Sequence, residues 1–189
     1  LFLNAGDYLI HYNVVALVSE IIKDEKCDVA HGNCINVNPF SGEYSINKGT
    51  ANYCPEFFYN NAMPHQAIFY KKGILIKFGF YDEKFKIISD NLLNKKIFCD
   101  KTVSKKYIDQ IISVYFWDGI SSQSSGHFGS IHNKERELFY KEGFNKKELT
   151  DIFESVDRRE KIRIKKNKKS VLRFLSKLFR KFYEEWVNK

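Results

Sequence analysis

The chain has 189 residues, of which 43% are hydrophobic and 16% aromatic, so it holds enough apolar material for one sizeable core. This composition excludes a disordered or low-complexity protein, and no uninterrupted apolar stretch approaches the length of a membrane span. The net charge of +8 is concentrated in residues 161–189, which hold 11 Lys and Arg against 2 Asp and Glu, so the remainder of the chain is close to neutral.

The first elements alternate between strand and helix. Leu1–Leu3 is a short apolar run that predicts a buried strand, and Asn4–Asp7 supplies turn residues after it. Apolar residues at helical spacing predict a helix over Asn13–Lys23. Asp28–Ala30 reads as another strand, which ends in a turn at His31–Asn33. This alternation is typical of α/β folds.

The middle of the chain mixes turn-forming and apolar segments. Pro39–Tyr53 is rich in Gly, Ser, Asn and Thr and indicates a loop or an irregular hairpin. Ala67–Tyr70 is a β-type run. In Asp82–Asn94 the apolar residues recur at helical spacing, which places Ser89 and Asp90 on a short helix or at its approach.

The last third begins with a strand and becomes helical. Ile111–Trp117 predicts a strand, and the Ser- and Gly-rich Ser121–Ser130 predicts a flexible loop. A charged helical region is expected over Asn133–Val156, followed by an amphipathic helix over Ser170–Val187. We therefore expect two parts, a domain at residues 1–157 and a basic helical tail at residues 158–189.

Several short segments in a fixed order resemble one enzyme family. They are Phe2–Asp7, Pro64–Gln66, Phe80–Glu83, Ile87–Asp90 and Gly119–Ser121. Together they resemble the family 2 glycosyltransferases of GT-A fold, in the branch that assembles bacterial capsules, O-antigens and colanic-acid-like polysaccharides. The resemblance covers roughly residues 1–139. It implies an α/β fold with a Rossmann-like mixed sheet, of which this chain holds the second, acceptor-side half. The amphipathic helix predicted from the apolar spacing of the tail follows this half.

The resemblance places a metal-binding turn at the start of the chain. In the family an Asp-x-Asp motif at a strand end holds a divalent cation, Mg²⁺ or Mn²⁺, against the diphosphate of a nucleotide sugar. Here Asn4 stands where an Asp is usual, Gly6 occupies the second acidic position, and Asp7 falls one residue later. Asp7 is therefore the metal candidate. The alternative is that Asp7 only caps the turn and the following helix.

The resemblance also implies the remaining site residues. Asp90 matches the catalytic base, which would accept a proton from the acceptor hydroxyl, although an isolated Asp on a helix is more often a surface charge or a cap. His65 and Gln66 match a His-Gln pair beside the donor and acceptor cleft. Asn4, Asp82 and Glu83 are grouped with this pair as donor- or acceptor-binding residues. For Asp82 and Glu83 the alternative is that they support the loop that leads to the base. His127 and His132 are interpreted as exposed loop residues.

The implied function is transfer of a sugar, with inversion, from a nucleotide-sugar donor to a saccharide or polyprenyl-linked acceptor in surface polysaccharide biosynthesis. Family members begin with a nucleotide-binding half, so the chain is expected to start partway through the enzyme domain. The alternative is a truncated, non-catalytic interaction module derived from such an enzyme. Without the nucleotide-binding half the chain would be inactive.

Irregularly spaced cysteines indicate neither a zinc site nor a disulfide framework, which favours a cytoplasmic location. The apolar stripe of the tail argues against nucleic acid as a partner. It favours peripheral attachment of residues 161–189 to an anionic membrane on the inner face of the plasma membrane, or packing on the domain itself. The same stripe is a candidate homodimer surface.

Overall fold

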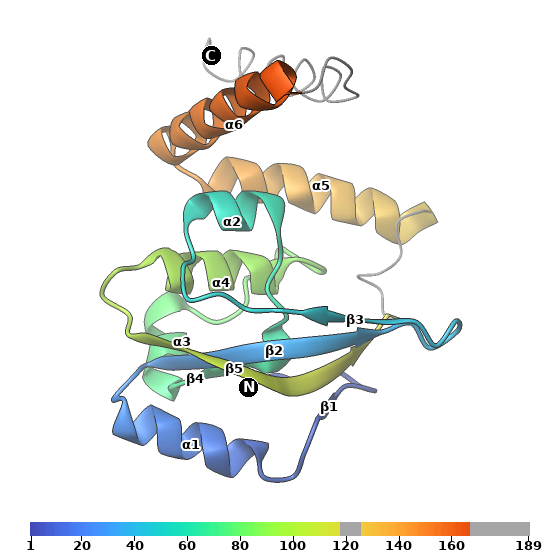
Figure 1. Cartoon of the computed structure of the whole chain (residues 1–189), viewed down its shortest axis with the longest axis vertical. Coiled ribbons are helices and arrows are strands. Elements are labelled where there is room, and N and C mark those ends of the chain that lie inside the picture. The colour runs from blue at the N-terminus through green and yellow to red at the C-terminus, as the bar shows by residue number, and fades with distance from the viewer. Residues whose placement is uncertain (118–125, 167–189) are drawn as a thin grey trace. The chain divides into compact units, whose positions relative to one another are not determined.

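The computed structural model describes residues 1–117 and 126–166, with side chains described for 1–117 and 128–159. The chain divides into two compact units, Leu1–Asn145 and Lys146–Lys189. The first unit is an α/β structure around a five-stranded mixed sheet (Figure 1). The described part of the second unit is a single helix, α6 (Lys146–Lys166). The fold class predicted from the sequence is thus confirmed at the level of an α/β unit with a mixed sheet.

The first unit contains these elements in chain order: β1 (Tyr8–Leu9), α1 (Val14–Asp24), β2 (Val29–Val37), β3 (Tyr44–Asn47), α2 (Pro55–Asn60), the 3-10 turn η1 (His65–Ala67), β4 (Ile68–Tyr70), α3 (Lys72–Phe78), α4 (Ser89–Cys99), β5 (Lys105–Phe116) and α5 (Gly126–Gly143).

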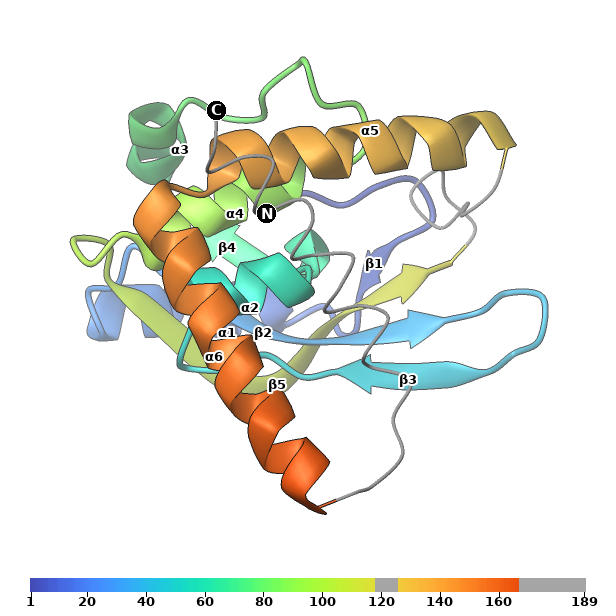
Figure 2. The ribbon, with the colours of Figure 1, turned by 90° about the horizontal axis from the view of Figure 1, so that it is seen from above.

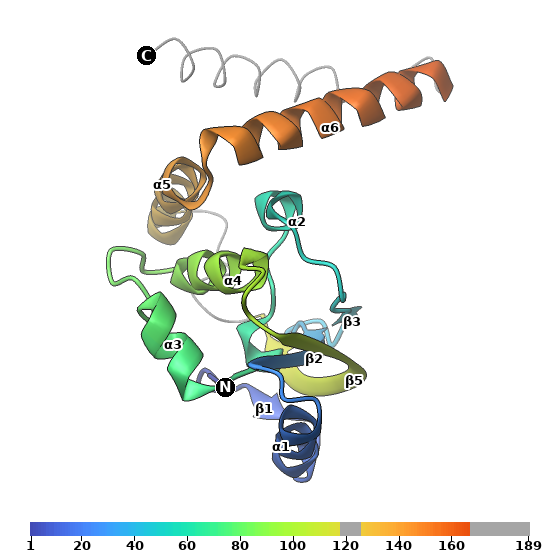
Figure 3. The same cartoon turned by 90° about the vertical axis from the view of Figure 1, so that its left-hand side faces the viewer.

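The sheet is organised around β2. Strand β5 runs parallel to β2 along one edge, while β3 and β4 pair antiparallel with different halves of its other edge. Figure 2 shows β3 returning beside β2 as a hairpin. Parallel neighbours need a crossover connection, and the segment containing α2, α3 and α4 supplies it. Helices α1 and α4 lie on opposite faces of the sheet (Figure 3).

Apolar residues at helical spacing place a core on each face. Val14 and Val18 of α1 pack with Ala30 and Cys34 of β2 and with Ile112 of β5. On the other face, α4 buries Leu92, Leu93, Ile97 and Phe98. Because both faces of the sheet are covered, β2 is buried from Val29 to Cys34.

Four predicted elements differ from the structure. Leu1–Leu3 pairs with no strand in the described chain, and Phe2 instead packs its ring against Tyr70 and Tyr81. Strand β2 does not turn at His31–Asn33 but continues through an irregular register with β5, where a side chain on Gly32 would meet the carbonyl of Gln110 at 2.8 Å.

The third difference concerns the flexible loop expected at Ser121–Ser130. Helix α5 begins at Gly126, inside that loop, and then ends at Gly143, so the expected single helical region is two helices. Residues 118–125 and the amphipathic helix expected over Ser170–Val187 lie outside the described residues. The fourth difference is the helix expected within Asp82–Asn94, because α4 begins at Ser89 and runs to Cys99. The expected helix at Asn13–Lys23 and the strand at Ala67–Tyr70 are confirmed. Pro39–Tyr53 contains the turn and the second strand of a hairpin whose first strand is the end of β2.

A buried histidine makes the stability of the fold depend on pH. His31 is 2% exposed, its ring contacts the rings of Tyr53, Phe98 and Tyr107, and its Nδ1 has no hydrogen-bond partner in the described structure. Burial lowers the pKa of His31 from 6.5 to about 4. Below pH 6.5 the unfolded chain therefore binds a proton that the folded chain does not, and stability falls as the pH drops towards 4.

We expect this residue alone to make the protein about 2 kcal/mol less stable to urea at pH 5 than at pH 7. His31→Phe should flatten this part of the pH dependence because it removes the titrating group and keeps an aromatic ring. His11→Phe, at an exposed position, is the matched control and should leave the slope unchanged. An identical slope in His31→Phe and the unmodified protein would contradict the assignment.

Candidate active site

A pocket of about 250 Å³ lies in the first unit, where several elements converge. Its walls come from the Asn4 turn, η1, the first turn of α4, the end of β5 and His132 on α5. Four predicted site residues line this pocket, although they come from three separate parts of the sequence: Asn4, His65, Gln66 and Asp90. The fold therefore brings the N-terminal turn and the predicted base to one place.

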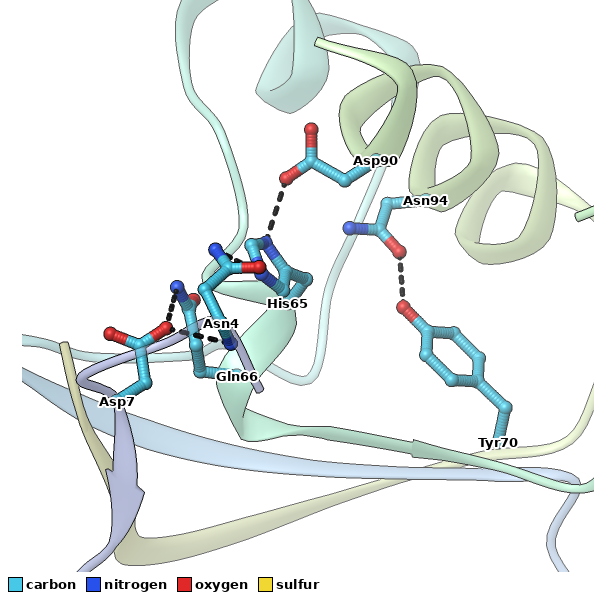
Figure 4. Close-up of polar contacts among 7 residues, drawn as sticks. All are labelled: Asn4, Asp7, His65, Gln66, Tyr70, Asp90 and Asn94. Atoms are coloured by element: carbon cyan, nitrogen blue, oxygen red, sulfur yellow. Dashed lines mark hydrogen bonds and ion pairs between the residues drawn. The ribbon is translucent and has the colours of Figure 1, made fainter. Parts of the chain in front are cut away.

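Asp90 is held by a relay of two side chains (Figure 4). His65 Nδ1 lies 3.0 Å from Asp90 Oδ2, and Asn4 Nδ2 lies 3.3 Å from His65 Nε2. Since the Asn4 amide nitrogen can only donate, Nε2 accepts, and the proton of the neutral imidazole is on Nδ1, from which it is donated to the carboxylate. Asp90 Oδ1 is left without a bond in this relay, so this oxygen can accept a proton from a ligand.

The position of Asp90 follows from the local sequence. Asp90 lies in the first turn of α4, where a carboxylate is favoured by the unpaired amides of the helix end. His65 is the first residue of the 3-10 turn η1. It follows Pro64, which has no backbone N–H to donate to a preceding helix or strand. Helix α4 and η1 thus place the Asp90 carboxylate and the His65 imidazole within hydrogen-bonding distance of each other.

Asp7 and Gln66 form a second pair next to the first. Gln66 Nε2 donates to Asp7 Oδ2 at 3.0 Å, and Gln66 is only 3% exposed. Two backbone amides also donate to the Asp7 carboxylate, that of Asn4 at 3.3 Å and that of Phe116 at 3.4 Å. Asp7 therefore ties the N-terminal turn to η1 and to the end of β5, and it closes the turn as the capping alternative expects.

The surroundings of Asp7 limit the kind of metal site it could form. In the described part of the chain, no group of three or more His, Cys, Asp and Glu side chains is placed to hold a metal ion. Mg²⁺ is often held by one or two carboxylates together with substrate phosphates, rather than by protein ligands alone. Asp7 suits a site in which carboxylate and substrate phosphates share the cation, because it supplies one carboxylate beside the pocket.

Asp82 and Glu83 do not line the pocket. The Asp82 carboxylate accepts from the backbone amide of Lys84 at 3.2 Å, and its carbonyl accepts from the Ser89 hydroxyl at 3.0 Å. Glu83 is exposed. Asp82 thus shapes the turn that leads into α4, which is the supporting part of the role expected for it.

Two buried phenols lie near Asp90. Burial raises the pKa of Tyr81, and the negative charge of Asp90 raises it further. The pKa of Tyr70 is also raised, mainly by burial and then by Tyr81 and Asp90. Tyr70 donates to Asn94 Oδ1 at 2.5 Å, one turn beyond Asp90 on α4 (Figure 4). Both phenols stay protonated at neutral pH and leave Asp90 as the acidic group of this region.

Sequence reasoning missed several residues of the pocket. Asn36, Asn47, Asn91, Tyr115 and Trp117 all line it. The sequence marks these residues only weakly as site residues. Each is a polar or aromatic residue at the end of a strand or on a helix turn, which is a common place for such residues. His132, interpreted as an exposed loop residue, is instead a half-buried residue of α5 that faces the pocket. The side chain of His127 lies outside the described residues.

Searches for similar proteins give one group of distant relatives. No protein-family model matches the chain. The chain is 25% identical over 119 residues to the PGL/p-HBAD biosynthesis glycosyltransferases of Mycobacterium bovis and Mycobacterium tuberculosis. The match covers 61% of this chain and 43% of each relative, so the chain spans less than half the length of the proteins it matches. The pocket thus lies in a chain that is similar, over most of its length, to glycosyltransferases.

Proposed function

We propose that this chain is part of a family 2 glycosyltransferase of GT-A fold, which moves a hexosyl group from a nucleotide sugar to a saccharide or polyprenyl-linked acceptor with inversion, in surface polysaccharide biosynthesis. The observation that supports it best is the Asn4–His65–Asp90 relay in the wall of a pocket. A carboxylate that is oriented by a hydrogen bond and open to a ligand suits a general base.

In the proposed reaction, Asp90 accepts the proton of the acceptor hydroxyl as its oxygen attacks the anomeric carbon of the donor. The bond between that carbon and the diphosphate oxygen breaks, and the nucleoside diphosphate leaves with the electron pair. His65 keeps the Asp90 carboxylate in one orientation, because its Nδ1 proton is committed to Oδ2.

The donor side is assigned to Asp7. A divalent cation, Mg²⁺ or Mn²⁺, supplies positive charge to the leaving diphosphate when it is bound. Asp7 would hold this cation together with the phosphates, and Gln66 would keep the carboxylate in place through its bond to Oδ2. Asp82 then acts as a support of the turn before α4, and the exposed Glu83 is left as an acceptor contact.

The proposal is tested by measuring release of nucleoside diphosphate from a panel of sugar nucleotides, with Mg²⁺ or Mn²⁺ and with the full encoded protein. Turnover with one donor that depends on the cation and on an added saccharide is the expected result. No turnover together with no cation-dependent binding of any nucleotide would reject the enzyme function.

One observation favours the alternative of a non-catalytic interaction module. The Asp7 carboxylate already accepts three internal hydrogen bonds, so most of its capacity as an acceptor is used within the structure. In that case Asp7→Asn should unfold or loosen the protein without changing nucleotide affinity. If Asp7 binds the cation, the same variant should lose cation-dependent nucleotide binding while its midpoint of thermal unfolding changes little.

A further inference from the structure

We infer that the pocket is a subsite for one uncharged sugar ring of the acceptor, with Trp117 as its stacking surface and the amides of Asn36, Asn47 and Asn91 as its hydrogen-bonding groups. The inference rests on the proposed function in one respect only, namely that the hydroxyl of this ring nearest Asp90 is the one that reacts.

The charges of the pocket exclude an anionic occupant. None of the lining residues in the described chain is Lys or Arg, and the carboxylate of Asp90 is the only acidic group among them. Phosphate and carboxylate ligands are normally met by cationic side chains or by rows of backbone amides. A negatively charged ligand would here face Asp90 with no cationic side chain among the lining residues of the described chain.

His132 does not change this balance. Burial lowers the pKa of His132, and the positive charge of Arg136 one turn further along α5 lowers it as well, against a smaller opposite effect of Glu135. The pKa therefore lies below the ordinary value of 6.5, and the ring is neutral at pH 7. His132 can donate or accept one hydrogen bond but brings no cation to the pocket.

The amides of the pocket suit hydroxyl groups. Asn4 and Gln66 are engaged with His65 and Asp7, which leaves Asn36, Asn47 and Asn91 as lining amides. A primary amide both donates and accepts, as a sugar hydroxyl does. The Oδ1 atoms of Asn36 and Asn91 are shielded from solvent and have no partner in the described structure. Such unpaired acceptors are costly, and rotation of either amide towards a ligand hydroxyl would pair them.

Trp117 supplies the apolar surface. It is 48% exposed although it is one of the largest apolar side chains, and it lines the same pocket as the amides. Its backbone amide donates to the carbonyl of Val37 at 2.8 Å, which fixes its place at the end of β5. The flat C–H face of a pyranose can cover an exposed indole and remove both surfaces from water. The volume of about 250 Å³ lies below the usual range of about 300–1,000 Å³ for drug-sized ligands and suits a single ring.

Binding of free sugars tests the inference without any donor. Methyl glycosides of neutral hexoses and 6-deoxyhexoses are titrated into the full encoded protein and followed by saturation-transfer NMR, beside glucuronic acid, glucose 6-phosphate and inorganic pyrophosphate. At least one neutral glycoside should bind saturably and at least about tenfold more tightly than each of the anions. Equal or tighter binding of an anion, or no binding of any neutral glycoside, would overturn the inference.

Variants locate the binding in the pocket. Trp117→Ala should lower the affinity for the glycoside by about tenfold or more, and Trp117→Phe should retain part of that affinity. Asn91→Leu keeps the side-chain volume but should also lower the affinity. Tyr12→Ala, which removes an aromatic residue that is 85% exposed and does not line the pocket, is the matched control. Unchanged affinity in both Trp117→Ala and Asn91→Leu would place the sugar elsewhere and reject the subsite.

The sequence offers a direct probe of stacking. Trp117 and Trp186 are the two tryptophans of these 189 residues, so the emission that Trp117→Phe removes from a Trp186→Phe protein is the emission of Trp117. This emission should change saturably with the neutral glycoside, at the affinity measured by NMR; no change would reject Trp117 as the stacking surface. Sugar binding in the pocket without any release of nucleoside diphosphate would support the subsite and reject the glycosyltransferase function. Release of nucleoside diphosphate that Trp117→Ala does not change would support the glycosyltransferase function and reject the subsite.

Discussion

Asp90→Asn is expected to lower the kcat for sugar transfer by about 10²- to 10⁴-fold, the usual contribution of a general base. The amide keeps the shape of the carboxylate, and its oxygen can still accept the hydrogen bond from His65 Nδ1, so the pocket should stay folded. The neutral amide cannot take up the proton of the acceptor hydroxyl. The loss should therefore fall on kcat, while the acceptor KM changes little.

The measurement compares initial rates of nucleoside diphosphate release at saturating donor and acceptor. Asp24→Asn is the matched control, because Asp24 is an exposed carboxylate at the end of α1 and lies outside the pocket. It should keep the full rate. An Asp90→Asn protein that retains most of its activity would remove Asp90 as the base, whatever its stability.

The relay predicts how His65 variants should behave. His65→Ala removes the donor to Asp90 and should lose activity, whereas His65→Asn can place its Nδ2 near the position of the imidazole Nδ1 and should lose less. If His65 acts only through Asp90, combining His65→Ala with Asp90→Asn should cost little more than Asp90→Asn alone. Additive losses would show that His65 has an independent role.

The sequence predicted the elements that have a strong local signal. The apolar spacing of α1 and the β-type runs at Ile68–Tyr70 and Ile111–Phe116 follow directly from periodicity, and the structure confirms them. The spacing within Asp82–Asn94 placed Asp90 on a helix or at its approach, and α4 begins one residue before it, at Ser89. Leu1–Leu3 failed as a strand because three apolar residues specify burial but not a pairing partner. Its burial is partly met through the ring of Phe2 against Tyr81.

The site was predictable only in part, for a physical reason. Asp90, His65 and Asn4 could be singled out because they lie in short segments with a recognisable order. Asn36, Asn91 and Trp117 could not, since each becomes part of the pocket only when β2, α4 and β5 meet. The relay itself joins residues 61 and 25 positions apart, and no local pattern encodes a contact of that kind.

Glu135 shows the same limit most clearly, because it is one acidic residue among many on a charged helix. In the structure Glu135 is 7% exposed. Its carboxylate accepts hydrogen bonds from the backbone amides of Lys86, Ile87 and Ile88 at 2.6, 2.9 and 3.1 Å. Ile87 and Ile88 line the pocket and lead directly into the turn of α4 that holds Asp90. Glu135 thus fixes the backbone that positions the proposed base.

Glu135→Ala should lower the free energy of unfolding by about 2–4 kcal/mol, because three amides lose a charged acceptor and the one of Ile88 is left buried. Glu135→Gln keeps one acceptor oxygen and should lie between Glu135→Ala and the unmodified protein. The exposed Glu137→Ala on the same helix is the control and should change stability by no more than about 0.5 kcal/mol. The local readout is native-state hydrogen exchange, which should become faster at the amides of residues 86–88 in Glu135→Ala. Unchanged protection of these amides would show that they are held by something other than the Glu135 carboxylate.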